Sequence, residues 1–113
     1  MKKASGGTFS LKLTDAEPIE MDLLELKKAD LVVKALNHKL RLSILKLLSE
    51  KPKSPVTAVY TKLKLEQSVA SQHLAIMRRA GIVKSEREGK YIYYTLEPSR
   101  IIQILELAKQ LSN

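Results

Sequence analysis

Apolar residues recur at helical spacing along most of the chain, and in one short stretch they alternate instead. Spacings of three, four and seven residues predict amphipathic helices, because side chains at these intervals share one face. The pattern predicts a first helix from about Glu20, and further helices over residues 40–49, 54–63, 67–81 and 98–111. The chain is therefore predicted to be mainly α-helical.

Residues 1–20 do not share this pattern. They contain Gly6, Gly7 and Pro18 and no sustained helical period. We expect a flexible N-terminal arm here, with at most a short extended piece in TFSLKL. The folded domain is then expected over residues 21–113, with Asn37 as the N-cap of its second helix.

The helix predicted from Gln67 has two sides of different chemistry. Its apolar side holds Ala70, Leu74 and Met77. The opposite side carries short polar side chains and an arginine, namely Ser68, Gln72, Ala75 and Arg79, with Ser71 on the flank. No acidic residue occurs between Gln67 and Ser85, which is unusual for a face that meets only water. Gly81 is predicted to end this helix.

The alternating stretch, IVKSEREGKYIYYTL, predicts a two-stranded hairpin with its turn at Glu88-Gly89. Ile92 and Tyr94 would face one side, and Tyr91 and Tyr93 the other. The third and fourth helices, separated by a short turn, predict a helix-turn-helix with the hairpin as a wing. The predicted fold class is mainly α with a small β-hairpin wing, a winged helix-turn-helix.

Composition adds a charge argument. The chain has 113 residues, enough for one domain, and a net charge of +8. Residues 41–95 hold 11 Lys and Arg against 4 Glu, and so carry +7 of this excess. A localised basic excess points to a polyanion, with nucleic acid first; the alternative is a basic surface that meets only solvent.

Double-stranded DNA fits the polar side of the fourth helix. Gln72 has the donor and acceptor that match adenine, and Arg79 suits guanine or phosphate. Arg87 and Lys90 at the hairpin tip suit the phosphate backbone or the minor groove. The predicted DNA-binding residues are Ser68, Ser71, Gln72, His73, Arg78, Arg79, Arg87 and Lys90. For His73, on the flank of the apolar side, a structural role is the favoured alternative.

The last helix has apolar residues on more than one stripe and so needs two partners, its own core and another surface. We expect a homodimer. The residues predicted at its interface, on the first and last helices, are Leu24, Leu31, Ile101, Ile104, Leu105 and Ala108.

Three segments together resemble the ArsR/SmtB family of bacterial winged-helix repressors: ALNHKLRLSILKLL, SVASQHLAIMRRAGIV and REGKYIYYTL. They follow the family's order and spacing over most of residues 35–96. The resemblance implies a homodimer that binds an operator and represses transcription, with the first and last helices as the dimer interface.

The chain departs from the family pattern at several positions. Lys64 stands where the turn usually has Gly, and Glu66 stands at the cap position of the recognition helix, where Ser is frequent. Many members bind metal through a cysteine pair, or through Asp and His on the last helix. Here SPVTAVY has no Cys, and the last helix offers only Glu106. We therefore predict no metal site and no cofactor, and the effector stays unassigned.

Two further residues are open to more than one interpretation. His38 fits a surface or capping role, with a ligand pair formed with His73 as the alternative. Arg41, which matches a family arginine, fits either a buried salt bridge or a phosphate contact.

Other function classes find less support. No stretch of about 18 apolar residues and no signal-peptide core is present, so a cytoplasmic protein without a membrane partner is expected. There is no Gly-rich phosphate loop and no nucleophile with its base, which argues against an enzyme. A winged-helix module that binds another protein is the competing hypothesis.

Overall fold

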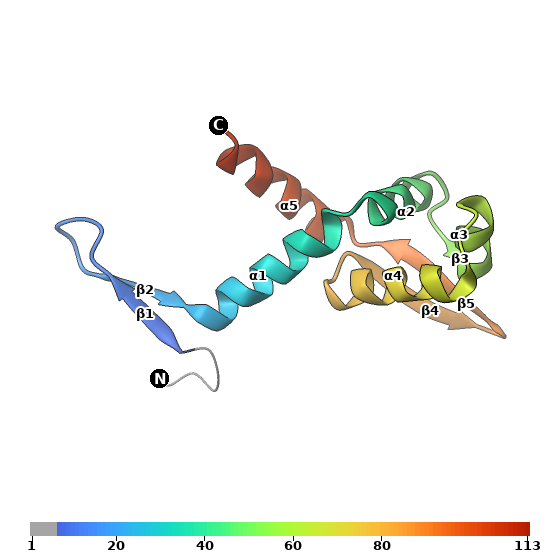
Figure 1. Cartoon of the computed structure of the whole chain (residues 1–113), viewed down its shortest axis with the longest axis horizontal. Helices are drawn as coiled ribbons and strands as arrows, with labels where there is room; N and C mark the ends of the chain where they lie inside the picture. The colour runs from blue at the N-terminus through green and yellow to red at the C-terminus, as the bar shows by residue number, and fades with distance from the viewer. Residues whose placement is uncertain (1–6) are drawn as a thin grey trace. The chain divides into compact units, whose positions relative to one another are not determined.

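The structure is a computed structural model that describes residues 7–113 (Figure 1). The chain divides after Leu31 into two compact units. Residues 1–6 of the predicted arm, including Gly6, lie outside the described residues.

The first unit contains a hairpin, of which the sequence predicted only the short extended piece in TFSLKL. Strand β1 (Thr8–Leu11) pairs in antiparallel fashion with β2 (Ile19–Asp22), so that Thr8 lies opposite Asp22. Helix α1 (Leu23–Leu36) follows β2 directly and so begins three residues after the predicted start. Asp22 Oδ1 accepts hydrogen bonds from the backbone N–H groups of Leu24 at 2.9 Å and Glu25 at 3.4 Å, which caps the first turn of α1.

The second unit has the predicted order of helices and wing. Its elements are α2 (Lys39–Glu50), β3 (Ser54–Pro55), α3 (Val56–Lys62), α4 (Gln67–Arg79), β4 (Val83–Glu88), β5 (Tyr91–Leu96) and α5 (Pro98–Leu111). The three strands form an antiparallel sheet in the order β3-β5-β4. This is a winged helix-turn-helix, and the predicted fold class is confirmed. No helix among residues 7–113 is long and apolar enough to span a membrane.

Aliphatic side chains from several helices and the sheet build the core of this unit. The largest fully buried ones are Ile44, Leu48, Val59, Leu74, Met77, Ile82 and Val83. The predicted apolar side of α4 is confirmed, because Ala70, Leu74 and Met77 are each 0% exposed. The opposite side of α4 is therefore held toward solvent.

The end of α4 follows the prediction for Gly81. Gly81 has a φ of 77°, and its N–H donates to Arg78 O at 3.0 Å while the N–H of Ile82 donates to Met77 O at 2.9 Å. This pair of hydrogen bonds is a Schellman motif, which needs a left-handed residue and so favours glycine.

Three local predictions were wrong by one or two residues. The N-cap of α2 is His38 rather than Asn37, since His38 Nδ1 accepts the N–H of Leu40 at 3.1 Å. Ser54 and Pro55 do not start a helix but pair with β5 opposite Tyr94 and Tyr93. The wing turn lies at Gly89-Lys90 rather than Glu88-Gly89, because Glu88 pairs with Tyr91 and Gly89 takes the positive φ of 65°.

Helix α5 carries apolar side chains both in the core and on its exposed surface. Ile104 is 9% exposed and lies in the core cluster, with Ile101 packed against it. Four further apolar side chains of α5 are exposed within the chain, Ile102 and Leu105 on one flank of the buried side and Leu107 and Leu111 on the other. Ile104, a predicted dimer residue, thus packs in the core of its own chain.

Candidate nucleic-acid interface

The turn between α3 and α4 sets the position of α4, the candidate recognition helix. Lys64 occupies it with a φ of 56°, in the left-handed region that suits glycine. The N–H of Leu65 donates to Tyr60 O at 2.9 Å, and Leu63 and Leu65 pack against the core. The helix-turn-helix thus forms with lysine at the turn, since flanking leucines fix the chain on both sides.

Glu66 is the N-cap of α4, and its side chain makes no capping hydrogen bond. A serine at this position would accept a hydrogen bond from the second or third N–H of the helix. The exposed Glu66 carboxylate instead adds a negative charge at the start of α4. That charge suits the positive helix end but would repel a nearby phosphate.

The polar side of α4 is exposed and has no partner within the described chain. Ser68, Ser71 and Gln72 are all exposed, and none of their side chains makes a hydrogen bond to any residue of 7–113. Arg78 and Arg79 are also exposed at the end of the helix, and among these residues neither forms an ion pair. Five polar side chains are thus available to an external ligand.

His73, the remaining predicted contact on α4, is placed differently. His73 follows Ser68 by five residues, and at about 100° per residue this places it roughly 140° around the helix from Ser68. It is half-buried, and its Nδ1 lies 3.3 Å from Arg41 Nη1. Its ring centroid is 4.9 Å from that of His38. This position favours the structural role over a base contact.

Arg41 joins α1, α2 and α4 behind the recognition helix. Its Nε donates to Ala35 O at 2.6 Å and its Nη2 to Lys34 O at 3.5 Å, so the guanidinium caps the end of α1. Neither sequence interpretation anticipated this, because the acceptors are backbone carbonyls that become available only where α1 ends. No ion pair of Arg41 is present among residues 7–113.

The same cluster changes the protonation of His73. Burial lowers the pKa of His73, and the nearby His38 and Arg41 add repulsion that lowers it further. A neutral His73 accepts from Arg41 through Nδ1, whereas a protonated ring would place two donors against each other. The cluster is therefore built around the neutral imidazole.

The wing presents exposed cations beside two tyrosines. Arg87 and Lys90 are exposed, with Arg87 Nη1 3.5 Å from Gly89 O and Lys90 Nζ 5.7 Å from the centre of the Tyr91 ring. The Tyr91 and Tyr93 rings meet edge to face, with centroids 6.3 Å apart, which confirms that they share a side of the hairpin.

Lys53 was missed by the sequence reasoning. Its Nζ forms an ion pair with Glu88 and lies 5.1 Å from the centre of the Tyr93 ring. The hydrogen bond to Glu88 raises the pKa of Lys53. Only the pairing of β3 with β5, two segments far apart in sequence, brings Lys53 to the wing. The positive charge of Lys53 offsets the negative charge of Glu88. The tip of the wing is therefore positively charged through Arg87 and Lys90.

The recognition helix and the wing are neighbours, because α4 contacts β4 (Figure 1). No three His, Cys, Asp or Glu side chains converge as a metal site within residues 7–113. What the described surface offers is hydrogen-bonding and cationic side chains on one helix and one hairpin, the chemistry that phosphates and base edges require.

Residues 38–85 match the model of the ArsR family of bacterial regulatory proteins. The transcriptional activator HlyU of Vibrio cholerae is 36% identical over 95 residues, which are 80% of this chain and 87% of HlyU. The transcriptional repressor PagR of Bacillus anthracis is 36% identical over 76 residues, 67% of this chain and 76% of PagR.

The chain belongs to the ArsR family. It is a DNA-binding transcriptional regulator with a winged helix-turn-helix domain. Solved structures agree: HlyU superposes with a TM-score of 0.62 at 32% identity, over 79% of this chain and 97% of HlyU. The homodimeric winged helix-turn-helix DNA-binding domain from Mycobacterium bovis, a possible ArsR-family regulator, gives a TM-score of 0.66 at 28% identity, over 79% of this chain and 82% of that domain. The sequence resemblance is thereby confirmed.

Proposed function

We propose that this ArsR-family protein acts as a homodimeric repressor that places α4 in the major groove of an operator. The observation that carries the proposal is the two-sided character of α4. Ala70, Leu74 and Met77 anchor one side in the core, while Ser68 and Gln72 stand exposed on the other. No acid lies between Gln67 and Ser85 to repel phosphate.

The side chains of α4 have distinct roles in this proposal. Gln72 reads adenine through a bidentate contact, while Ser68 and Ser71 are short enough to let the helix approach the base edges. Arg78 and Arg79, at the exposed end of α4, hold phosphate or guanine. His73 has a structural role, in which its contact with Arg41 holds α4 against α2.

The wing contributes affinity without sequence preference. Arg87 and Lys90 neutralise backbone phosphates, and each such contact releases counterions, so this part of the binding weakens with salt. The Lys53–Glu88 pair supports the wing by removing the repulsion that Glu88 would exert on the backbone.

The proposed dimer uses the first and last helices. Leu31 and Leu105 are each 58% exposed within one chain, and Ile101 and Leu24 are partly exposed. Ala108, also exposed, lies close to one turn beyond Leu105 and would let the helices approach closely. A seam of this kind should bury roughly 2,000 Å² or more. The two recognition helices would then lie about 34 Å apart, one turn of DNA.

The direction of regulation and the boundaries belong to the proposal as well. PagR is named a repressor and HlyU an activator, and we assign repression because an operator-bound dimer occupies DNA that polymerase needs. Residues 21–113 would form the DNA-binding and dimerising part. The protein would act in the cytoplasm, because prokaryotic DNA lies there. The protein acts by binding, without a catalytic step, metal or other cofactor.

A titration against genomic fragments tests this function. Fluorescence anisotropy with excess competitor DNA should reveal at least one fragment bound far more tightly than random sequence, and a promoter reporter carrying it should fall on expression of the protein. Equal affinity for all fragments, with capture of a defined protein partner by the α4 surface, would support the protein-interaction module instead.

A further inference from the structure

The β1–β2 hairpin has two chemically opposite faces. Residues that lie opposite each other in the ladder share a face, and successive residues alternate between faces. One face therefore holds four apolar side chains, Phe9, Leu11, Ile19 and Met21. The other holds four polar ones, Thr8, Ser10, Glu20 and Asp22. Such segregation is typical of a strand pair that covers another surface on one side.

The apolar face is open within the first unit. Phe9 and Ile19 are each 54% exposed, and no residue of 7–31 is buried. A two-stranded hairpin without such cover is at best marginally stable in water. The ordered register of the strands thus needs a partner surface outside the unit to which they belong.

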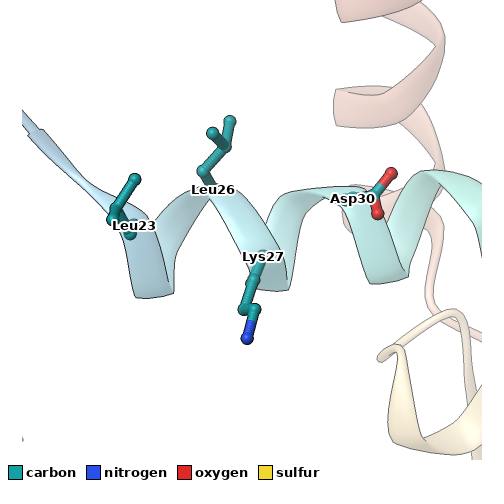
Figure 2. Close-up of a pocket in the computed structure, with 4 residues that line it drawn as sticks. All are labelled: Leu23, Leu26, Lys27 and Asp30. Atoms are coloured by element: carbon teal, nitrogen blue, oxygen red, sulfur yellow. The ribbon is translucent and has the colours of Figure 1, made fainter. Parts of the chain in front are cut away.

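The open apolar surface continues onto the first turns of α1. Leu23, Leu26, Lys27 and Asp30 follow one another along one face of the helix, at spacings of three and four residues, and line a shallow hollow (Figure 2). Leu26 is 54% exposed. The apolar side chains of the hairpin, which end at Met21, are thus followed in the sequence by those at the start of α1, which begin at Leu23.

We propose that the apolar face of the hairpin, formed by Phe9, Leu11, Ile19 and Met21, docks on a second copy of this chain and extends the dimer interface. The inference rests on the proposed homodimer. It adds a contact outside the segment that matches the family model, which begins at residue 38. The first reason for a second copy is continuity: β2 passes into α1 without a linker, and α1 carries Leu24 and Leu31 of the proposed seam.

Charge is the second reason. Residues 8–22 hold one lysine against four acids, a net charge of −3, while residues 23–113 hold 17 basic and 8 acidic residues, a net charge of +9. An acidic segment of this kind is repelled by DNA and by anionic membranes, which both carry phosphate. A second copy of the chain instead offers the opposite charge together with open apolar side chains, such as Leu111, which is 76% exposed.

Two matched substitutions on β1 test the proposal. Phe9→Ser changes the apolar face, and Ser10→Ala changes the polar face of the same strand. Sedimentation velocity over a concentration series should give a dimer Kd raised at least about tenfold for Phe9→Ser and within about twofold of wild type for Ser10→Ala. Circular dichroism checks that both variants keep the helical fold. An unchanged Kd for Phe9→Ser in an intact dimer would overturn the hairpin contact and leave the homodimer standing.

Photo-crosslinking identifies the occupant. Benzoylphenylalanine is placed at position 9 or 10, and dimers are mixed from ¹⁴N- and ¹⁵N-labelled chains. Mixed-isotope crosslinks from position 9, and few from position 10, support docking on the second copy. Crosslinks from position 9 that join only peptides of one isotope would show that the hairpin covers its own chain, and would overturn the proposal. A wild-type protein that sediments as a monomer would contradict the homodimer itself.

Discussion

Ile104 and Leu105 are neighbours in α5, and the same truncation should affect them differently. Ile104 is 9% exposed and lies in the core of its own chain, whereas Leu105 is 58% exposed. Ile104→Ala should therefore weaken the fold of each protomer. Leu105→Ala should act mainly on the association of two protomers, because most of the Leu105 side chain has no contact within its own chain.

The magnitudes follow from burial. Ile104→Ala removes three carbon atoms, each worth about 0.8 kcal/mol when buried. The cavity left behind brings the expected loss in the free energy of unfolding to about 2.5–4 kcal/mol. For Leu105→Ala the loss within the protomer should be about 1 kcal/mol, since less than half of the side chain is covered there. Leu105→Glu should raise the dimer Kd at least about 30-fold, the effect of losing about 2 kcal/mol at an interface.

Urea denaturation at several protein concentrations separates the two effects. Ile104→Ala should lower the midpoint by a similar amount at every concentration. Leu105→Glu should lower it most at low concentration, where its dimer has dissociated. The reasoning is refuted if Leu105→Ala costs as much protomer stability as Ile104→Ala, or if Leu105→Glu remains a dimer at micromolar concentration.

Three other predictions follow from single sites. Lys64→Gly should stabilise the fold by up to about 1 kcal/mol in thermal unfolding. The substitution removes the backbone strain of a lysine with positive φ, and this gain is partly offset because glycine gives the unfolded chain more conformational entropy. The pKa of His73 is lower in the folded protein than in the unfolded chain, so the unfolded chain is protonated first as pH falls. The neutral His73 therefore contributes its full stabilisation above a pH of about 6.5, and this stabilisation is lost as pH falls toward the lower pKa of the folded state. Denaturation from pH 8 to 5 should therefore show a smaller acid loss for His73→Gln than for wild type. Lys90→Ala should lower the salt slope of DNA binding by about one unit for each phosphate that the lysine neutralises, whereas Lys46→Ala, at a lysine paired with Glu50 on α2, should leave it unchanged.

Much of the second unit could be predicted because its signals are local. The period of Ala70, Leu74 and Met77 and the glycine at position 81 define α4 without reference to any other part of the chain. Strand β3 could not be predicted, since its two residues become a strand only by pairing with Tyr93 and Tyr94. The role of Lys53 follows from that pairing and was missed for the same reason.

The hairpin of the first unit escaped prediction for a different reason. Its strands have four residues each, and no two-residue turn signal joins Leu11 to Ile19. That Phe9 and Leu11 share a face with Ile19 and Met21 becomes visible only once the register is known. The candidate site shows the same limit: exposure of Gln72 follows from the helical period, but the contact of His73 with Arg41 depends on how α2 packs against α4.

Replacing Gln72 by alanine tests the central claim most directly. Affinities for the operator and for random DNA are measured across a salt series for wild type, Gln72→Ala and the control Gln103→Ala, which removes an exposed glutamine from α5. Gln72→Ala should cost about 1–3 kcal/mol per half-site on the operator, relax the preference at one base pair and leave random DNA unaffected. Equal weakening on both DNAs, or no change on either, would contradict α4 as the recognition helix.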